Sequence, residues 1–185
     1  MKTNVLRRML AFPVIVLVCF TSCKKASDLT TVNITLKLPR THFTYTEPAL
    51  KSGEVVLYSG LITINLDSVL NAYGFSSGVI QNTYFTNLVV TIEQPPTATL
   101  GWLSSMAVTV SDNQTFQPET QIGNVTNTDP NANSVVVTMN NLNIRPYLTK
   151  PSFYFRLYGV ISGQLPAATV GMFFDGSIQF RVEPL

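Results

Sequence analysis

The sequence predicts an all-β domain over residues 31–185, a two-sheet antiparallel β-sandwich of the jelly-roll or immunoglobulin-like type. Apolar and polar residues alternate with a period of two in several segments, which is the pattern of half-buried strands. Charged residues make up only 12% of the chain, while Thr, Asn, Ser, Val and Leu are abundant, and this composition favours strands over solvated helices. No alternation of strand and helix patterns indicates a parallel sheet. A closed lipocalin-type barrel is the second choice, because the predicted strands are uneven in length.

The first predicted strands lie between residues 32 and 66. The first of them ends at Pro39 and carries alternating apolar residues at Val32, Ile34, Leu36 and Leu38. Residues 40–52 contain the single histidine, His42, and several turn signals, so we expect an irregular connection with at most a short edge strand. Two further extended runs, 55–58 and 61–66, are separated by Ser59-Gly60.

A change from period two to helical spacing predicts one short helix at 67–73. Asp67 is a suitable N-cap, and apolar residues follow it at helical spacing. Gly74 is placed to end the helix in a left-handed conformation.

The longest alternating run, residues 83–93, predicts a central strand. Its first face carries Tyr84, Leu88, Val90 and Ile92. Phe85 and Val89 make the second face apolar as well, so we expect this strand to be covered on both sides. Pro95-Pro96 ends it.

The second half of the chain supplies the remaining strands. They are expected at 106–110, 120–125, 135–139, 153–158 and 172–183, with one helical turn near Tyr147 and Leu148. The total is eight or nine strands without an internal repeat, at spacings typical of a sandwich.

The N-terminal 22 residues predict a signal peptide that is removed. Arg7 and Arg8 form a positive region, and Met9–Phe20 supply twelve residues without a charge. This apolar run suits a secretory signal and falls short of the roughly 20 residues that a membrane-spanning helix needs. A cysteine, Cys23, follows closely.

The residues Phe20-Thr21-Ser22-Cys23 resemble the lipobox of bacterial lipoprotein precursors, in a relaxed form that keeps the cysteine. The resemblance implies cleavage before Cys23, attachment of acyl chains such as palmitate to Cys23, and a tether at 23–30 that holds the domain close to the bilayer. Two or three acyl chains anchor stably where one would be reversible. Lys24 stands where an aspartate would imply inner-membrane retention, so the resemblance implies the outer membrane and leaves its periplasmic and surface faces open.

A second resemblance concerns the folded domain. The stretches Leu66–Leu70, before a central strand, and Ile144–Leu148, before an aromatic strand, are similar to stretches in uncharacterised β-sandwich lipoproteins of Gram-negative bacteria. This resemblance implies a location and a fold, and it names no activity.

Removal of the leader changes the charge and the cysteine count. Lys2, Arg7 and Arg8 leave with it, so twelve basic residues become nine against ten acidic ones. Without a basic surplus we expect no nucleic-acid partner. Cys19 leaves as well, so the mature chain keeps one cysteine and forms no internal disulfide.

No motif predicts catalysis, and we expect a non-enzymatic protein without a cofactor or a metal. His42 is the only histidine of the chain, and no partner motif surrounds it. A zinc site would need three protein ligands, and one histidine beside a lipidated cysteine does not supply them. A glycosidase would need two paired carboxylates, and no motif pairs any two of Asp67, Glu93, Asp112, Glu119, Asp129 and Asp175.

Oxygen-bearing side chains occupy every second position from Asn127 to Asn133, a pattern shared with calcium-binding loops. The glycine and the glutamate that such loops require are replaced by Ala132 and Thr138. We therefore expect an Asx-rich turn between strands.

The candidate binding surface is a group of outward-facing aromatic and basic side chains. Alternation along 153–158 places Tyr154, Arg156 and Tyr158 together on the face opposite the core, and Phe173 is expected to join them from a neighbouring strand. Aromatic rings bind the apolar faces of sugars, and an arginine offers paired donors to acidic groups. The alternative is a second packed face or a cross-strand aromatic pair.

Together these features predict a lipid-anchored, non-catalytic protein of the outer membrane, whose sandwich binds an envelope protein or a glycan. One alternative is a pilin- or adhesin-type structural subunit that exchanges an edge strand. Another is a carbohydrate-binding module of a glycan-uptake system.

Overall fold

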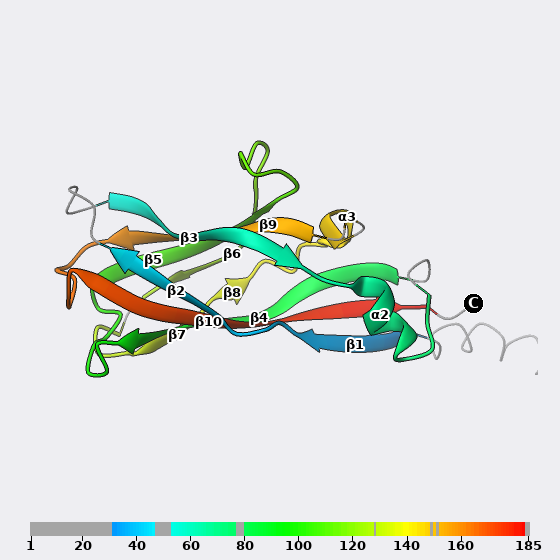
Figure 1. Cartoon of the computed structure of the whole chain (residues 1–185), viewed down its shortest axis with the longest axis horizontal. Coiled ribbons are helices and arrows are strands. Elements are labelled where there is room, and N and C mark those ends of the chain that lie inside the picture. The colour runs from blue at the N-terminus through cyan, green and yellow to red at the C-terminus, as the bar shows by residue number, and fades with distance from the viewer. Residues whose placement is uncertain are drawn as a thin grey trace, which may run out of the picture.

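The computed structural model describes residues 31–46, 53–76, 80–127, 129–148, 150 and 152–183. They form two antiparallel five-stranded sheets that face each other, with two short helices beside them (Figure 1). This confirms the predicted all-β, two-sheet sandwich. The leader, Cys23 and the tether at 23–30 lie outside the described residues.

The first sheet, sheet A, consists of β1 (Val32–Lys37), β2 (Thr41–Thr46), β10 (Thr169–Val182), β4 (Ile80–Gln94) and β7 (Ser134–Val136). β1 and β2 follow each other along the same edge of β10, with Val32 opposite Val182 and Thr46 opposite Thr169. Residues 40–52 were expected to form an irregular connection with at most a short edge strand, and part of this segment is strand β2. Between the two strands, the Leu38 backbone N–H donates to the Gly176 carbonyl over 2.9 Å, which keeps the chain on this edge.

The second sheet, sheet B, consists of β3 (Gly53–Thr63), β9 (Ser152–Ile161), β5 (Leu103–Ser111), β6 (Thr120–Thr126) and β8 (Thr138–Met139). β3 is one strand of 11 residues, so the predicted break at Ser59-Gly60 was wrong. Gly60 stays paired with Phe155, and a bulge between Val56 and Tyr58 absorbs the irregularity.

The single strand predicted at 135–139 is divided between the two sheets. β7 pairs with β4, and β8 pairs with β6. Val137, between them, is buried, and its backbone N–H donates to the Leu88 carbonyl over 2.9 Å. This segment therefore crosses one side of the sandwich from sheet A to sheet B.

The prediction that β4 is covered on both faces was wrong. Phe85 pairs with Ile178 and Asn87 pairs with Ser177, so β4 has one extra residue at this point. Because this bulge reverses the side-chain alternation, Phe85 faces the same core as Leu88. The opposite face is exposed at Asn87 and half-buried at Val89.

The helices are close to their predicted places. α2 spans Leu66–Asn71, and its cap is Asn65, whose side-chain oxygen accepts from the Ser68 N–H over 2.9 Å. The predicted cap, Asp67, lies within the first turn, where a negative charge interacts favourably with the helix dipole. Gly74 follows with φ +78°, the expected left-handed conformation. α3 spans Arg145–Leu148, as predicted.

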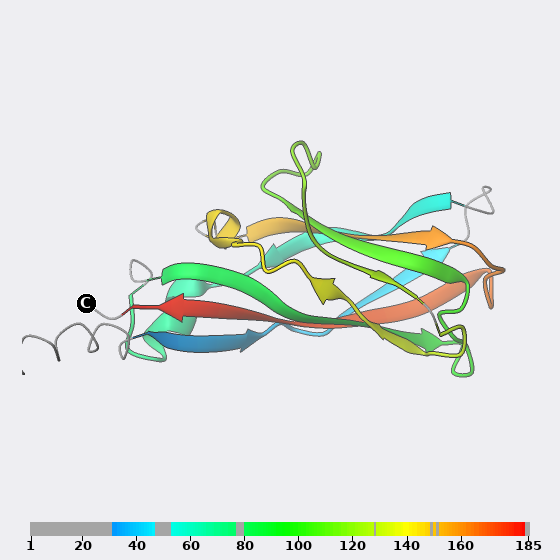
Figure 2. The same cartoon turned by 180° about the vertical axis from the view of Figure 1, so that it is seen from behind.

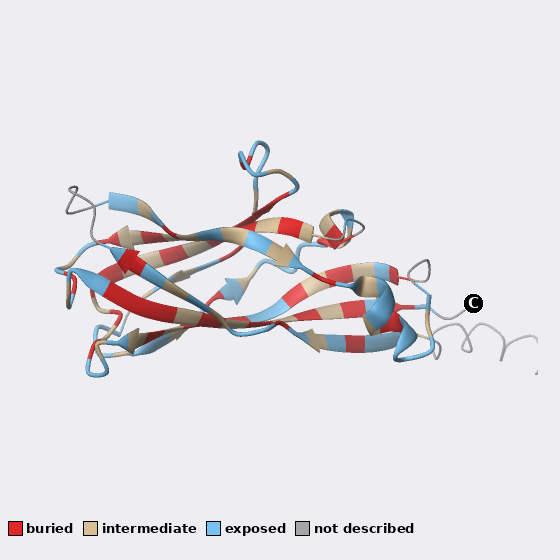
Figure 3. Cartoon of the chain, viewed as in Figure 1, coloured by how far each residue is buried: buried red, intermediate tan, exposed pale blue. Residues whose placement is uncertain are grey.

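The core lies between the two sheets, where buried positions alternate along the strands (Figure 3). Its largest fully buried side chains include Phe153, Phe155, Phe174 and Phe180. In the described part of the chain, no helix combines the length and the apolar character that crossing a bilayer requires.

The two ends of the sandwich differ. At the near end, Val32 lies opposite Val182, so the described chain begins and finishes at the same end, beside α2 (Figures 1 and 2). β10 spans 14 residues and runs from this end to the other, a length of about 45 Å. The connections 95–102, 127–133 and 162–168 meet at this far end.

Candidate functional site

The predicted binding surface lies on the outer face of sheet B. Alternation along β9 buries every second residue in the core and brings Tyr154, Arg156 and Tyr158 together on the other face. Phe173 is not among them, because β10 belongs to sheet A. We call the group of Tyr154, Arg156 and Tyr158 the Arg156 face.

The connection between β5 and β6, residues 112–119, rises on this side of sheet B (Figure 1). Phe116 from this loop is only 4% exposed, and its ring centroid lies 3.6 Å from the Arg156 guanidinium carbon. The same ring meets Tyr154 edge-on, at 6.1 Å and 70°. Phe116 therefore occupies the aromatic and cationic surface that a ligand would use.

Local hydrogen bonds explain the shape of this loop. The Asn113 side-chain oxygen accepts from the Thr115 N–H over 3.0 Å and from the Gln117 N–H over 3.3 Å. Phe116 has φ +55°, a left-handed conformation that is unfavourable for a residue with a side chain. Burial of its ring offsets this strain.

The polar groups of the Arg156 face are largely satisfied within the chain. Glu119 accepts from the Tyr158 hydroxyl over 3.1 Å and lies 3.7 Å from an Arg156 nitrogen. Arg156 also donates to the Tyr158 hydroxyl over 2.8 Å, and Thr109 donates to Glu119 over 3.1 Å. The Arg156 Nε is buried without a partner among the described residues. This arrangement favours a second packed face over an open binding surface.

The outer face of sheet A carries the only histidine. His42 lies on β2, and its Nδ1 is 2.9 Å from the Glu93 carboxylate. Among the described residues, no hydroxyl is hydrogen-bonded to His42.

Phe173 lies in the same region of sheet A. Its ring is 5.6 Å from His42 and 4.1 Å from the Arg40 guanidinium carbon. Arg40 donates two hydrogen bonds to Asp175, over 3.1 and 3.0 Å, and these raise the pKa of Arg40. This exposed ion pair between Arg40 and Asp175 holds the guanidinium in place and contributes little to stability.

The loop that shares a pattern with calcium sites is an Asx-rich turn. The Asn127 side-chain amide donates to the carbonyls of Leu100 and Leu103, over 2.9 and 3.1 Å. The Asp129 carboxylate accepts from the Asn131 N–H over 2.9 Å. These side chains hold the loop against its neighbour, and the described residues contain no cluster of three His, Cys, Asp or Glu that could hold a metal.

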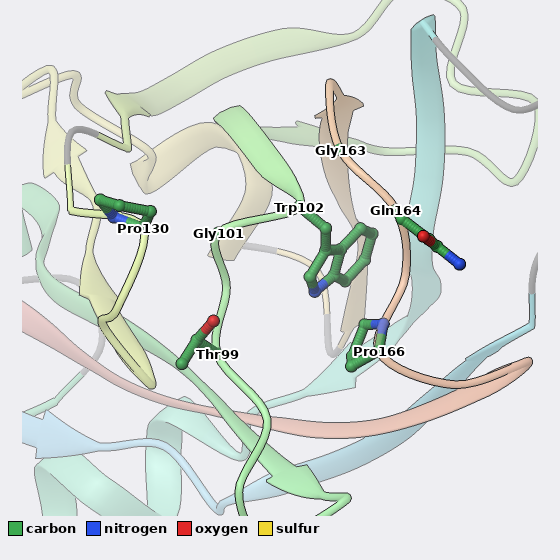
Figure 4. A pocket seen from close by; sticks show the side chains of 7 residues that line it. All are labelled: Thr99, Gly101, Trp102, Pro130, Gly163, Gln164 and Pro166. Carbon is green, nitrogen blue, oxygen red and sulfur yellow. The ribbon is translucent and has the colours of Figure 1, made fainter.

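A pocket of about 260 Å³ lies at the far end, where the three connections meet (Figure 4). We call it the Trp102 pocket. It is lined by Thr99, Gly101, Trp102, Pro130, Gly163, Gln164 and Pro166.

Two glycines allow the three connections to come this close. A Cβ at Gly101 would overlap the Pro130 carbonyl, and one at Gly163 would lie 3.2 Å from the Trp102 Cα. The Trp102 carbonyl accepts from the Ser162 and Gly163 N–H groups, over 3.0 and 3.2 Å. Backbone contacts between the connections therefore build the walls of the pocket.

Trp102 has an unusual polar group. The residue is 3% exposed, and one face of its indole stacks on Tyr45, with centroids 5.7 Å apart and planes 17° apart. Its Nε1 is buried and has no hydrogen-bond partner among the described residues. None of the seven lining residues is charged.

The sequence patterns did not single out Trp102. The available signal is the only tryptophan of the chain directly after a glycine, between two predicted strands. The pocket residues from the other two connections are 28 to 64 residues away from Trp102 in the sequence, so spacing alone does not reveal the pocket.

Comparisons with known proteins leave the family open. No family model matches the chain, and no curated protein matches it. A solved structure of infectious bursal disease virus, Gt strain, is 14% identical with a TM-score of 0.40, covering 82% of this chain and 32% of that one. N-glycanase F is 16% identical with a TM-score of 0.39, covering 83% and 42%. The chain thus spans less than half of either structure, and no function follows from similarities this low.

Proposed function

We propose that this protein is a lipid-anchored, non-catalytic binding protein of the cell envelope, held in the outer membrane through Cys23. The observation that carries the proposal is the separation of the two ends of the sandwich. β1 begins nine residues after Cys23, a distance of at most about 30 Å, so an anchor at Cys23 keeps the near end close to the bilayer. The Trp102 pocket and its loops lie at the opposite end, where a partner can reach them.

The chemistry of the described residues supports binding rather than catalysis. His42 is engaged with Glu93, and Glu119 is engaged with Tyr158 and Arg156. An activated nucleophile needs an adjacent base, and among the described residues no Ser or Thr hydroxyl is hydrogen-bonded to His42. The partner is an envelope protein or a glycan.

Metabolic labelling tests the anchor. Cells that express the full-length protein are grown with a palmitate analogue, and the outer membrane is isolated. The wild-type protein is expected to carry the label and to fractionate with the outer membrane, whereas Cys23→Ala is expected to remain unlabelled and unprocessed. Cys19→Ala is the matched control, because this cysteine lies in the leader and its loss should leave the label in place. Equal labelling of wild type and Cys23→Ala contradicts the proposal.

A structural subunit that exchanges an edge strand is the second candidate. Among the described residues, β3 pairs with β9 alone and so forms a long edge of sheet B, and its Val56 and Leu61 are 44% and 50% exposed. A free strand edge can pair with a strand from another chain. Polymers of the processed protein on native gels would favour this function, and a stable monomer counts against it.

A further inference from the structure

We infer that the Trp102 pocket binds a neutral sugar residue of a glycan. The inference deepens the proposed function by naming a site and a ligand class, and it rests on that function for the source of the glycan.

The lining of the pocket matches the surface of a sugar ring. Pro130 and Pro166 offer apolar surface beside the nearly buried Trp102, and Thr99 offers a hydroxyl, while the Gln164 amide points away from the indole (Figure 4). A pyranose likewise combines apolar C–H faces with a rim of hydroxyl groups that donate and accept hydrogen bonds. The absence of charge among the seven lining residues favours a neutral ligand over an acidic one, because none of them is a cation that could pair with a carboxylate.

The unpaired indole N–H of Trp102 indicates that the ligand supplies a hydrogen-bond acceptor. Buried donors without an acceptor are rare in folded proteins, and each one requires an explanation. In Figure 4 the ring nitrogen lies on the side of the indole that faces Thr99 and Pro166. The nitrogen is buried here, so a sugar hydroxyl or ring oxygen would accept this hydrogen bond once the indole turns to bring the N–H to the pocket surface.

The size and rigidity of the pocket agree with one sugar residue. Its volume of about 260 Å³ is just below the roughly 300–1,000 Å³ of sites for drug-sized ligands. The three connections are already tied together, for example by the Leu100 N–H, which donates to the Ala132 carbonyl over 2.8 Å. A pocket that is formed beforehand loses little conformational entropy on binding.

Trp102 is the only tryptophan in the chain, so intrinsic fluorescence reports directly on this pocket. The full-length protein in detergent is titrated with glucose, galactose, N-acetylglucosamine and their β-linked disaccharides, and with glucuronic acid as a charged comparison. We expect a saturable change in Trp102 emission with at least one neutral sugar, and at least about tenfold weaker binding of glucuronic acid. Flat titrations with every neutral sugar up to about 50 mM, which covers millimolar affinities, overturn the inference.

Two variants locate the binding. Trp102→Phe keeps an aromatic ring beside Tyr45 and removes the indole N–H, and Thr99→Val removes the hydroxyl and keeps the fluorescent reporter. Calorimetry is expected to show about tenfold weaker binding for Trp102→Phe and severalfold weaker binding for Thr99→Val. Gln81→Ala, an exposed position at the near end, is the matched control, and circular dichroism confirms that each variant is folded.

The outcomes separate the two proposals. Unchanged sugar binding in both pocket variants overturns the Trp102 site and leaves the glycan-binding protein intact. A protein that is labelled at Cys23 and binds no sugar overturns the sugar ligand and leaves the anchored protein intact. Equal labelling of the wild type and Cys23→Ala overturns the anchor. The titration alone then tests the pocket.

Discussion

The Arg156 face and the Trp102 pocket both combine aromatic rings with hydrogen-bonding groups, but the folded chain covers the first and leaves the second open. On the Arg156 face, Phe116 and Glu119 of the same chain fill the positions that a ligand would take. In the Trp102 pocket, space remains open and the indole N–H has no acceptor among the described residues. Because the Arg156 Nε is also buried without a partner among the described residues, the contrast lies in the open space. Residue types identify a possible site, and the space left open after folding decides between the possibilities.

The largest expected effect comes from uncovering the Arg156 face. Phe116→Ala removes a ring that is 4% exposed, so we expect the free energy of unfolding to fall by about 3 kcal/mol, the low end for a buried phenylalanine. Tyr73→Ala, at a side chain that is 57% exposed, should change it by less than about 0.5 kcal/mol. Urea unfolding measures both. A loss below about 1 kcal/mol for Phe116→Ala means that the loop does not cover this face.

The next effect concerns the walls of the Trp102 pocket. Gly101→Ala places a Cβ against the Pro130 carbonyl, and backbone must move, which is expected to cost about 1–3 kcal/mol. Gly163→Ala meets the Trp102 Cα at 3.2 Å, so a smaller loss is expected. Thermal unfolding ranks the two variants, and Trp102 emission shows whether the pocket has changed. Equal stability of Gly101→Ala and the wild type would show that the connections do not depend on this close approach.

A smaller effect tests the internal hydrogen bonding of the Arg156 face. Glu119→Gln removes the charge that faces Arg156, and we expect a loss of about 1 kcal/mol, because the two side chains are 36% and 21% exposed. A double-mutant cycle with Arg156→Met isolates their coupling, which should be about 0.5–1 kcal/mol in favour of the pair. Zero coupling would mean that the carboxylate and the guanidinium are independent, as on an open surface.

The smallest expected effect is a pH dependence of stability beside the Arg156 face, which the uncharged Trp102 pocket should not share. At the base of the 112–119 loop, the hydrogen bond from Lys150, 2.8 Å long, lowers the pKa of Asp112. A lowered carboxylate pKa stabilises the folded state above the ordinary value of about 4, and this stabilisation is lost as the pH falls through the lowered value. The stability difference between wild type and Asp112→Asn should therefore be constant from about pH 7 to 5 and vanish in stronger acid. A difference that grows on acidification would reverse the sign of this coupling.

Much of the fold follows from the period of the apolar residues. β5, β9 and β10 were predicted from alternation alone, because each has one face in the core. β2 was expected only as a short edge strand at most, since it is held by β10, more than 120 residues away. The bulge that turns Phe85 inward also depends on pairing with β10, and local sequence does not reveal it.

The candidate site was predicted less completely, for the same physical reason. Alternation correctly placed Tyr154, Arg156 and Tyr158 on one face. It could not show that Phe116 would cover them, because that depends on a left-handed residue and on the hydrogen bonds of Asn113. The Trp102 pocket combines segments from three connections, so it exists only once the sheets have formed.

Calorimetry of one neutral glycan with two variants tests the central claim most directly. Trp102→Phe alters the pocket, and Arg156→Met alters the face that the chain itself covers. The dissociation constant is expected to rise about tenfold in Trp102→Phe and to change by less than about twofold in Arg156→Met. The reverse order, with full binding in Trp102→Phe and loss in Arg156→Met, would place the ligand on the Arg156 face and contradict the account.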